Sequence, residues 1–269
     1  MAPRPATCRG RRALGAAVLL PLLSLLFAGF SEGAPGGDSA KRKPKRRARP
    51  PAAPTAPTVP RAEQVNLRRF FGDSSGTFVL LDGKSGRRRV YNPQQAARRF
   101  TPYSTFKIPN TLIALDTGVA DGPDFGLAWD RTKAPAEDWW PKTWARDHRL
   151  RTALRDSVVW FYQELARRVG PQRMEEHVRR FGYGNMDLSG GIDQFWLRGG
   201  LRISADEQVD FLRRIHRGEV GVSERSTAVL KEILVLEDCP AFRLSGKSGT
   251  GPAGSSGSDS VDDPIEVGW

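Results

Sequence analysis

A serine and a lysine three residues apart, Ser104 and Lys107, are the first residues in this sequence whose types and spacing could do covalent chemistry. Residues three apart at the start of a helix lie on one face about one turn apart, so the hydroxyl and the amine can meet. A lysine can serve as the base for a serine nucleophile where burial lowers its pKa or where it is chemically modified. Free backbone N–H groups at a first helical turn also stabilise a developing oxyanion. The pair therefore predicts acyl transfer through Ser104.

The same spacing also fits an N-cap serine followed by a solvated lysine, and it occurs by chance about once in a chain of this length. The order of the later motifs favours the chemical interpretation. Ser104 is followed by Ser157-Val158-Val159, then Tyr183-Gly184-Asn185, then Lys247-Ser248-Gly249-Thr250. These motifs together make up the Ser-x-x-Lys, second-serine and Lys-Thr/Ser-Gly set of penicillin-recognising serine acyltransferases.

Two other features of the sequence could be mistaken for functional sites. Lys84-Ser85-Gly86 matches the third motif equally well, but it precedes the serine and lies between two strand-like segments, so we interpret it as a turn. The three histidines, His148, His177 and His216, are flanked by charged or helical-surface residues. We interpret them as surface histidines and predict neither a Ser-His-Asp triad nor a metal site.

The elements that must position these residues alternate between strand and helix patterns. Residues 76–82 and 87–91 predict a hairpin with its turn at 83–86, and a helix is predicted from Ser104 to Leu115 with a bend at Pro109. Further helices are predicted at 156–169, 173–180, 205–214 and 226–236, and strands at 241–244 and from Ile265. This order predicts an α+β fold, in which an antiparallel sheet formed by both ends of the chain is flanked by helices and a helical subdomain.

The charge is unevenly distributed and divides the chain into three parts. Residues 1–61 hold 12 Lys and Arg against 2 acidic residues, which leaves 30 against 28 for residues 62–269. Residues 1–34 have the charged, apolar and small-residue order of a secretory signal, which predicts export to the periplasm, cell envelope or exterior. Residues 35–61 form a basic Pro/Ala-rich linker, predicted to be disordered, that could contact the anionic cell envelope. The folded domain, 62–269, is nearly neutral, so nucleic acid is not predicted as a partner.

The chain resembles class D, oxacillinase-like serine β-lactamases in continuous stretches as well as in motifs. The resemblance covers about residues 64–269 and is strongest at 101–115, 156–170 and 191–205. Tyr183-Gly184-Asn185 stands where class A enzymes would have Ser-Asp-Asn, which favours class D. The resemblance implies a β-lactamase that hydrolyses penicillin-type antibiotics and contributes to antibiotic resistance.

The resemblance also implies roles for individual residues. Lys107 would react with CO2 to form a carbamate, the base that activates Ser104 and later the hydrolytic water; no other cofactor is expected. Ser157, with Lys247 nearby, would pass a proton to the β-lactam nitrogen, and the backbone N–H groups of Ser104 and Thr250 would form the oxyanion hole. Trp196 would donate its indole N–H to the carbamate, although a core tryptophan is the alternative. The remaining expected contacts with the substrate or oxyanion are Val159, Tyr183, Asn185, Ser248 and Gly249.

The chain departs from the family pattern in two places. The third motif reads Lys-Ser-Gly where most members have Lys-Thr-Gly, which keeps a hydroxyl. Members of the family also continue past the position of Trp269 with the rest of a strand, a substrate-binding arginine and a helix, so the C-terminal end is expected to be incomplete. The alternatives are a non-hydrolysing penicillin sensor, a cell-wall transpeptidase and a basic polymer-binding protein, and the deacylation rate distinguishes all three from the enzyme.

Overall fold

The computed structural model describes residues 62–252 and 266–269. The predicted signal, the predicted linker and most of the Gly/Ser/Asp-rich segment after Gly251 therefore lie outside the described residues. The strands are β1 Glu63–Gln64, β2 Phe78–Leu81, β3 Arg88–Tyr91, β4 Arg99–Phe100, β5 Gly126–Leu127, β6 His148–Arg149, β7 Ile203–Ser204, β8 Val235–Cys239, β9 Phe242–Ser245, β10 Thr250–Pro252 and β11 Glu266–Gly268. The helices are α1 Arg68–Phe71, α2 Pro93–Ala97, the 3-10 helix η1 Tyr103–Phe106, α3 Lys107–Asp116, α4 Leu150–Arg155, α5 Val159–Val169, α6 Pro171–Phe181, α7 Ala205–Arg217 and α8 Glu224–Ile233.

The predicted hairpin is present, and its turn contains the second Lys-Ser-Gly sequence. β2 pairs with β3 in antiparallel register from Phe78 opposite Tyr91, and β1 adds to β3 in parallel. The Asp82 carboxylate accepts hydrogen bonds from the backbone N–H groups of Lys84 and Ser85, and Gly86 adopts a φ of 70°. An Asx-type turn with a left-handed residue closes the hairpin, so the interpretation of this motif as a turn is confirmed.

Among the described strands, the two ends of the chain do not join one sheet as the sequence analysis predicts. β1, β3 and β2 form a sheet of their own, whereas β8 pairs with β9 and β10 pairs with β11. β11 ends next to the segment before η1. The indole of Trp269 donates a hydrogen bond to the Thr101 carbonyl at 2.9 Å. This anchoring holds β10 and β11 against η1.

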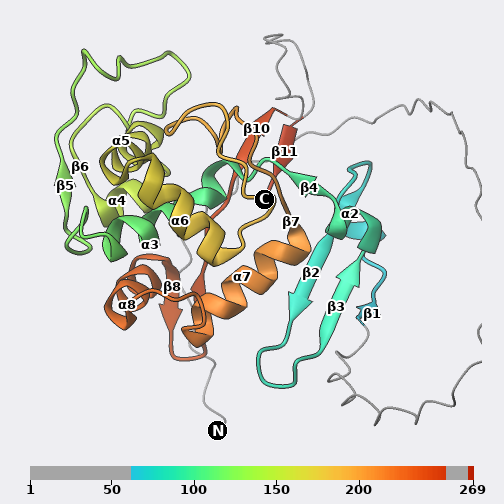
Figure 1. Ribbon diagram of the computed structural model, residues 1–269. Coiled ribbons are helices and arrows are strands. Elements are labelled where there is room, and N and C mark those ends of the chain that lie inside the picture. Colours follow the sequence, from blue (N-terminus) through green and yellow to red (C-terminus); the bar gives the residue numbers. More distant parts are fainter. Residues whose placement is uncertain (1–61, 253–265) are drawn as a thin grey trace, which may run out of the picture.

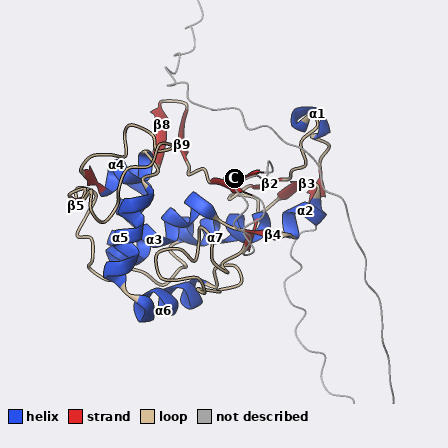
Figure 2. Cartoon of the chain, turned by 90° about the horizontal axis from the view of Figure 1, so that it is seen from above, coloured by secondary structure: helices blue, strands red, loops and turns tan. Residues whose placement is uncertain are grey.

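Helix α3 lies at the centre of the helical block. Its first eight residues, from Lys107 to Ala114, are all buried, as expected of a helix covered on every side. It packs against α5, α6 and α8, while α7 packs against β2 and α2 (Figure 1). Viewed from above, the block around α3, α4, α5 and α6 lies on one side of α7, and the β2–β3 hairpin with α2 lies on the other (Figure 2). The segment that contains Ser104 and Lys107 therefore leads into the most enclosed of the helices in the described part of the chain.

The helix boundaries differ from the predictions where local backbone geometry intervenes. α5 begins at Val159 because Ser157 adopts a left-handed φ of 58°. The predicted helix 226–236 ends at Ile233, and its last residues belong to β8. The bend predicted at Pro109 is replaced by a change of helix type two residues earlier. Pro109 then falls in the first turn of α3, where its missing N–H has no helical partner to lose.

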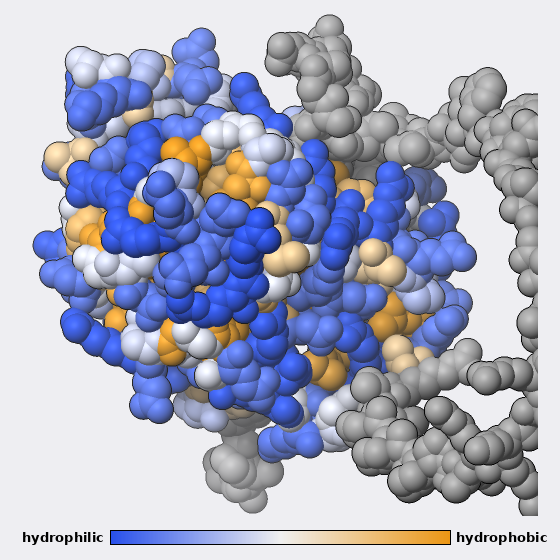
Figure 3. Space-filling model, viewed as in Figure 1, coloured by the Kyte–Doolittle hydropathy of each residue, from blue (hydrophilic) through white to orange (hydrophobic). Residues whose placement is uncertain are grey.

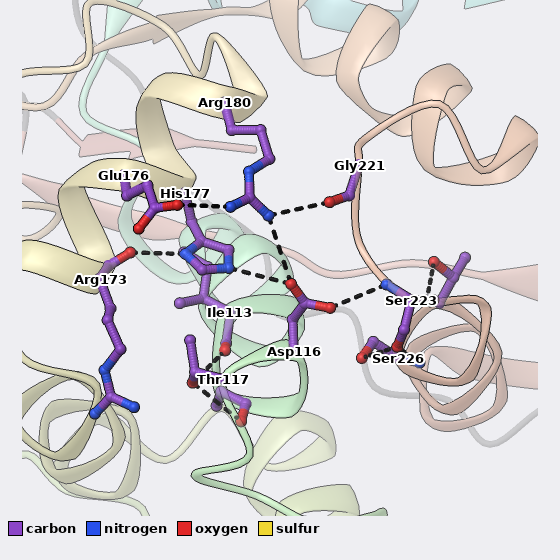
Figure 4. A network of polar contacts seen from close by, with 12 residues as sticks. Ile113, Asp116, Thr117, Arg173, Glu176, His177, Arg180, Gly221, Ser223 and Ser226 are labelled. Atoms are coloured by element: carbon purple, nitrogen blue, oxygen red, sulfur yellow. Dashed lines mark hydrogen bonds and ion pairs between the residues drawn. The ribbon is translucent and has the colours of Figure 1, made fainter.

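Two of the three histidines are buried, so the prediction that they lie on the surface is wrong for them. His148 bonds the Thr143 carbonyl and the Thr152 hydroxyl. His177 contacts the Arg173 carbonyl and, at 3.2 Å, the Asp116 carboxylate at the end of α3 (Figure 4). His177 shares a 3.6-residue spacing with buried apolar residues of α6, namely Met174, Val178 and Phe181. That spacing, rather than the charged sequence neighbours, indicates the buried side of the helix.

The outer surface contrasts with this packed interior. In the face shown in Figure 3, hydrophilic residues dominate and the apolar residues are scattered between them. No helix among the described residues combines the length and apolar character that a membrane span needs. The apolar side chains of this domain are gathered in one core around α3, α5 and α6.

Candidate active site

The predicted nucleophile and base meet at the junction of η1 and α3. Ser104 lies in η1 and Lys107 is the first residue of α3. The Lys107 amine donates a hydrogen bond to the Ser104 hydroxyl at 2.8 Å. This distance is within the range for a proton transfer between the two groups. The geometry thus gives Ser104 an adjacent base.

The environment of Lys107 disfavours its charged form. The residue is completely inaccessible to solvent, and its amine lies 5.4 Å from the centre of the Tyr162 ring. Burial holds the pKa of the amine well below its ordinary value, and the positive charge of Lys247 lowers it further. A neutral amine can accept a proton or react with an electrophile, which an ammonium cannot do.

An aromatic cluster forms the wall next to this pair. Phe106 stacks on Trp196 with ring centres 5.4 Å apart and makes edge contacts with Phe195 and Tyr183. Trp196 is almost fully buried, with 1% of its surface exposed. The cluster encloses Phe106, the residue that precedes Lys107, and so forms part of the buried interior from which α3 begins.

The third motif lies directly against the nucleophile segment. A side-chain carbon at Gly249 would come within 2.9 Å of the Pro102 carbonyl oxygen and 3.1 Å of the Thr105 nitrogen. The backbone N–H of Trp269 donates to the Gly249 carbonyl at 2.8 Å. Only a glycine allows these two segments of the chain to approach so closely. Ser248 and Thr250, on either side of Gly249, are exposed.

Lys247 is half-buried, and its amine donates to the backbone carbonyl of Ser248 at 2.8 Å. Burial lowers the pKa of Lys247 to about 8. Near neutral pH this lysine is mostly charged, and because its pKa is close to that pH it can readily give up a proton. It therefore supplies a cation close to Lys107, whose own charged form is disfavoured.

The second serine of the predicted set occupies a strained turn. Ser157 has a φ of 58°, in the left-handed region that non-glycine residues rarely adopt and that often occurs at functional sites. Tyr103, the residue before Ser104, is also left-handed, with a φ of 47°. Val159 begins α5 and is half-buried. Both predicted serines thus lie in or directly after an unusual backbone conformation.

Tyr183 and Asn185 are both held by contacts within the domain. Tyr183 is completely buried, and its ring lies between Phe106 and Phe211. The amide of Asn185 donates to the Gly200 carbonyl at 2.8 Å and accepts from the Arg202 backbone N–H at 2.8 Å. Tyr183 therefore supports the aromatic wall beside Phe106, and Asn185 holds the loop that contains Gly200 and Arg202.

Gln208 is a site residue that the sequence analysis missed. Its amide donates to the Thr105 hydroxyl at 2.7 Å, and its carbonyl oxygen accepts from the Tyr183 hydroxyl at 3.4 Å. It lies on the buried stripe of α7 with Phe211 and Ile215. A polar residue on an otherwise apolar stripe is the signal that could have identified it, because a buried amide needs polar partners.

Comparisons with known proteins show which family the chain is similar to. The family model of the penicillin binding protein transpeptidase domain matches residues 76–269. The chain is 43% identical to beta-lactamase OXA-48 of Klebsiella pneumoniae over 65% of this chain and 64% of that protein. It is 40% identical to the probable beta-lactamase YbxI of Bacillus subtilis over 70% of this chain and 68% of that protein. The chain therefore spans about two thirds of the length of these relatives.

Solved structures show the same likeness in three dimensions. The structure of BPu1 beta-lactamase has a TM-score of 0.66 at 40% identity and covers 70% of this chain and 78% of that one. The C-terminal domain of the Bacillus licheniformis BlaR penicillin-receptor has a TM-score of 0.65 at 31% identity, covering 70% of this chain and 75% of that one. An enzyme and a receptor thus share this architecture.

Proposed function

Because the chain belongs to the penicillin-binding transpeptidase family, and within it to the class D serine β-lactamase-like proteins, we propose that it hydrolyses the β-lactam ring of penicillin-type antibiotics. The same likeness confirms the predicted α+β fold of serine β-lactamases. The observation that carries the proposal is the 2.8 Å hydrogen bond between Ser104 and the fully buried Lys107. An activated serine beside a neutral amine is the minimum that acyl transfer needs.

The first step prepares the base. The neutral amine of Lys107 attacks CO2, a C–N bond forms, and one proton leaves to solvent, so that Lys107 carries a carbamate anion. The depressed pKa of Lys107 supports this step because only a neutral amine has the free electron pair. Lys247 supplies a positive charge nearby that favours the anion once it has formed.

Acylation then follows at Ser104. The modified Lys107 takes the hydroxyl proton while Oγ attacks the lactam carbonyl carbon, and the backbone N–H groups of Ser104 and Thr250 receive the negative charge on the carbonyl oxygen. As the ring C–N bond breaks, the proton held by the modified Lys107 passes through Ser157 to the nitrogen, with Lys247 beside this path, so the carbamate regains its negative charge. The product is an ester on Ser104.

Hydrolysis completes the cycle. The modified Lys107 removes a proton from water, which attacks the ester carbon; as the ester C–O bond breaks, the modified Lys107 gives this proton to the Ser104 oxygen and the ring-opened acid leaves. In total, one water is added across the amide bond. We assign Val159, Trp196, Ser248 and Gly249 to the walls that orient the substrate, and Tyr183 and Asn185 to the residues behind them.

The test is nitrocefin hydrolysis by the full chain, with and without added bicarbonate, together with mass spectrometry for a penicilloyl adduct on Ser104. Turnover that bicarbonate stimulates, with a short-lived adduct on Ser104, is the expected result. Absence of both turnover and adduct would contradict the proposal. A Ser104→Ala variant serves as the matched control for the site of attachment.

A second candidate is a penicillin sensor that is acylated and does not turn over. The structural likeness to the BlaR penicillin-receptor domain favours it, since the two activities share the acylation step and differ in hydrolysis. A stoichiometric adduct that persists for hours in the presence of bicarbonate would support the sensor. Loss of the adduct within seconds to minutes would support the enzyme.

We further propose that residues 1–34 direct export and are removed, so that the basic segment 35–61 links the domain to the anionic cell envelope. The charged, apolar and small-residue order of the first part supports this proposal. Expression in a bacterial host, followed by N-terminal sequencing of the exported protein, tests it. A mature chain that still begins at Met1 would contradict it.

A further inference from the structure

A tryptophan-rich loop reaches the backbone next to Ser157. The indole N–H of Trp144 donates to the Asp156 carbonyl at 2.8 Å. The Asp156 carbonyl and the Ser157 backbone nitrogen belong to one planar peptide unit. The hydrogen bond from Trp144 therefore fixes the orientation of that peptide plane, which directly precedes the left-handed Ser157. Trp144 is nearly buried, with 6% of its surface exposed.

Trp144 is also bound from the other side of Ser157. The indole N–H of Trp160, in the first turn of α5, donates to the Trp144 backbone carbonyl at 2.8 Å. Trp144 therefore accepts a hydrogen bond from Trp160, three residues after Ser157, and donates one to Asp156, the residue before it. The short segment that contains Ser157 is held at both ends by Trp144.

The conformation of Ser157 needs such support. A left-handed φ at a non-glycine residue is unfavourable and persists only where the surroundings impose it. The helical hydrogen bonds of α4 reach Asp156, whose N–H donates to the Thr152 carbonyl at 2.9 Å. These helical bonds do not use the Asp156 carbonyl, which instead accepts the hydrogen bond from the Trp144 indole.

Neighbouring aromatic rings keep the Trp144 side chain in position. Trp139 and Trp140 contact its ring at centroid distances of 5.5 and 5.6 Å. The loop between β5 and β6 thus places the indole N–H of Trp144 against the backbone of the segment that contains Ser157. Packed rings restrict the alternatives open to this donor.

We propose that Trp144 is a positioning residue for Ser157, holding its backbone in the left-handed conformation that aims the hydroxyl at the reacting nitrogen. This inference rests on the proposed function, because it assigns Trp144 an effect on the acylation step in which Ser157 passes the proton. Trp144 acts through the Asp156–Ser157 peptide unit.

The experiment compares the full chain with Trp144→Phe, which keeps a ring and removes the N–H donor. Trp129→Phe is the matched control, because the Trp129 indole also donates to a backbone carbonyl at 2.8 Å in the same loop, that of Ala134. The rate of Ser104 acylation by a fluorescent penicillin should fall by about tenfold in Trp144→Phe and by less than about twofold in Trp129→Phe. Equal rates in the two variants would overturn the inference.

A double-mutant cycle separates positioning from a general loss of structure. If Trp144 acts through Ser157, then Trp144→Phe should have almost no further effect in a Ser157→Ala background. A tenfold effect that persists in that background would refute the assignment. Should Trp144→Phe fail to fold, Trp160→Phe removes the other bond to the same residue and gives the same cycle.

A readout that does not depend on catalysis distinguishes this inference from the proposed function. Hydrogen–deuterium exchange over residues 154–160 should be faster in Trp144→Phe than in the parent chain and unchanged in Trp129→Phe. A parent chain that penicillin does not acylate would refute the proposed function, and the exchange measurement would still decide whether Trp144 holds the Ser157 segment. Unchanged exchange in Trp144→Phe would refute the inference.

Discussion

The positive charge of Lys247 lowers the pKa of the Lys107 amine, adding to the larger effect of burial. The two lysines are 140 positions apart in the sequence, and the packing of Gly249 against Pro102 and Thr105 brings their segments together. The structure thus places a cation beside the residue that must lose its own charge. This relationship sets the pH range in which Lys107 can be modified.

Replacing Lys247 with alanine should move carboxylation of Lys107 to higher pH. Without the neighbouring charge the pKa of Lys107 rises, so at a given pH less of the amine is neutral. We expect the midpoint of carboxylation, followed by carbon NMR with labelled bicarbonate, to rise. Lys84→Ala, in the other Lys-Ser-Gly sequence, should leave the midpoint unchanged. A midpoint that falls in Lys247→Ala would contradict the electrostatic assignment.

The variant Lys107→Ala should still bind penicillin and lose turnover. Removal of the general base is expected to lower the hydrolysis rate by about 10³-fold, because both proton transfers depend on it. Because acylation also loses its base, mass spectrometry after long incubation should find an adduct on Ser104 that forms slowly and then persists. Full activity in Lys107→Ala would rule out the mechanism.

Trp196→Phe should make activity depend strongly on added bicarbonate. The smaller ring opens the wall that Trp196 forms with Phe106, admits water near the amine and weakens the carbamate. The rate of nitrocefin hydrolysis should recover at least in part at high bicarbonate. Trp129→Phe, whose ring lies against Trp140 and not against Phe106, should behave like the parent chain, and a bicarbonate response equal to that of Trp196→Phe would argue against the wall.

The variant Gly249→Ala should damage acylation by separating the third motif from the nucleophile segment. The added carbon meets the Pro102 carbonyl oxygen at 2.9 Å, and backbone atoms cannot easily move aside. We expect the acylation rate to fall by at least about tenfold. Gly83→Ala is the control, because an added carbon there meets nothing within 4 Å. Comparable acylation by the two variants would show that the close approach is unimportant.

Gln208→Leu should lower the free energy of unfolding by about 1 to 3 kcal/mol, since the buried Tyr183 hydroxyl loses its acceptor. Urea unfolding followed by tryptophan fluorescence measures the change. Gln172→Leu, at an exposed position of α6, should change stability much less. Equal losses would indicate that the Gln208 hydrogen bonds contribute little.

Local patterns in the sequence predict the elements on which the motifs lie. The hairpin around Asp82, the helix after Ser104 and the helix from Ala205 are present because alternating or 3.6-residue apolar spacing determines which face of each element is buried. The sequence also identifies the Ser104–Lys107 pair. A spacing of three residues on one helical turn brings the two side chains together without contacts from the rest of the fold.

Contacts between distant segments decide the rest. The burial that lowers the pKa of Lys107, the approach of Gly249 to Thr105 and the support of Ser157 by Trp144 each join residues from separate elements. The same is true of His177, whose neighbours in the sequence are charged although its surroundings in the fold are not exposed. By itself, the sequence determined which groups could react. Only the tertiary structure decided how deeply they are buried and which backbone conformations are held, because both depend on packing between residues far apart in the chain.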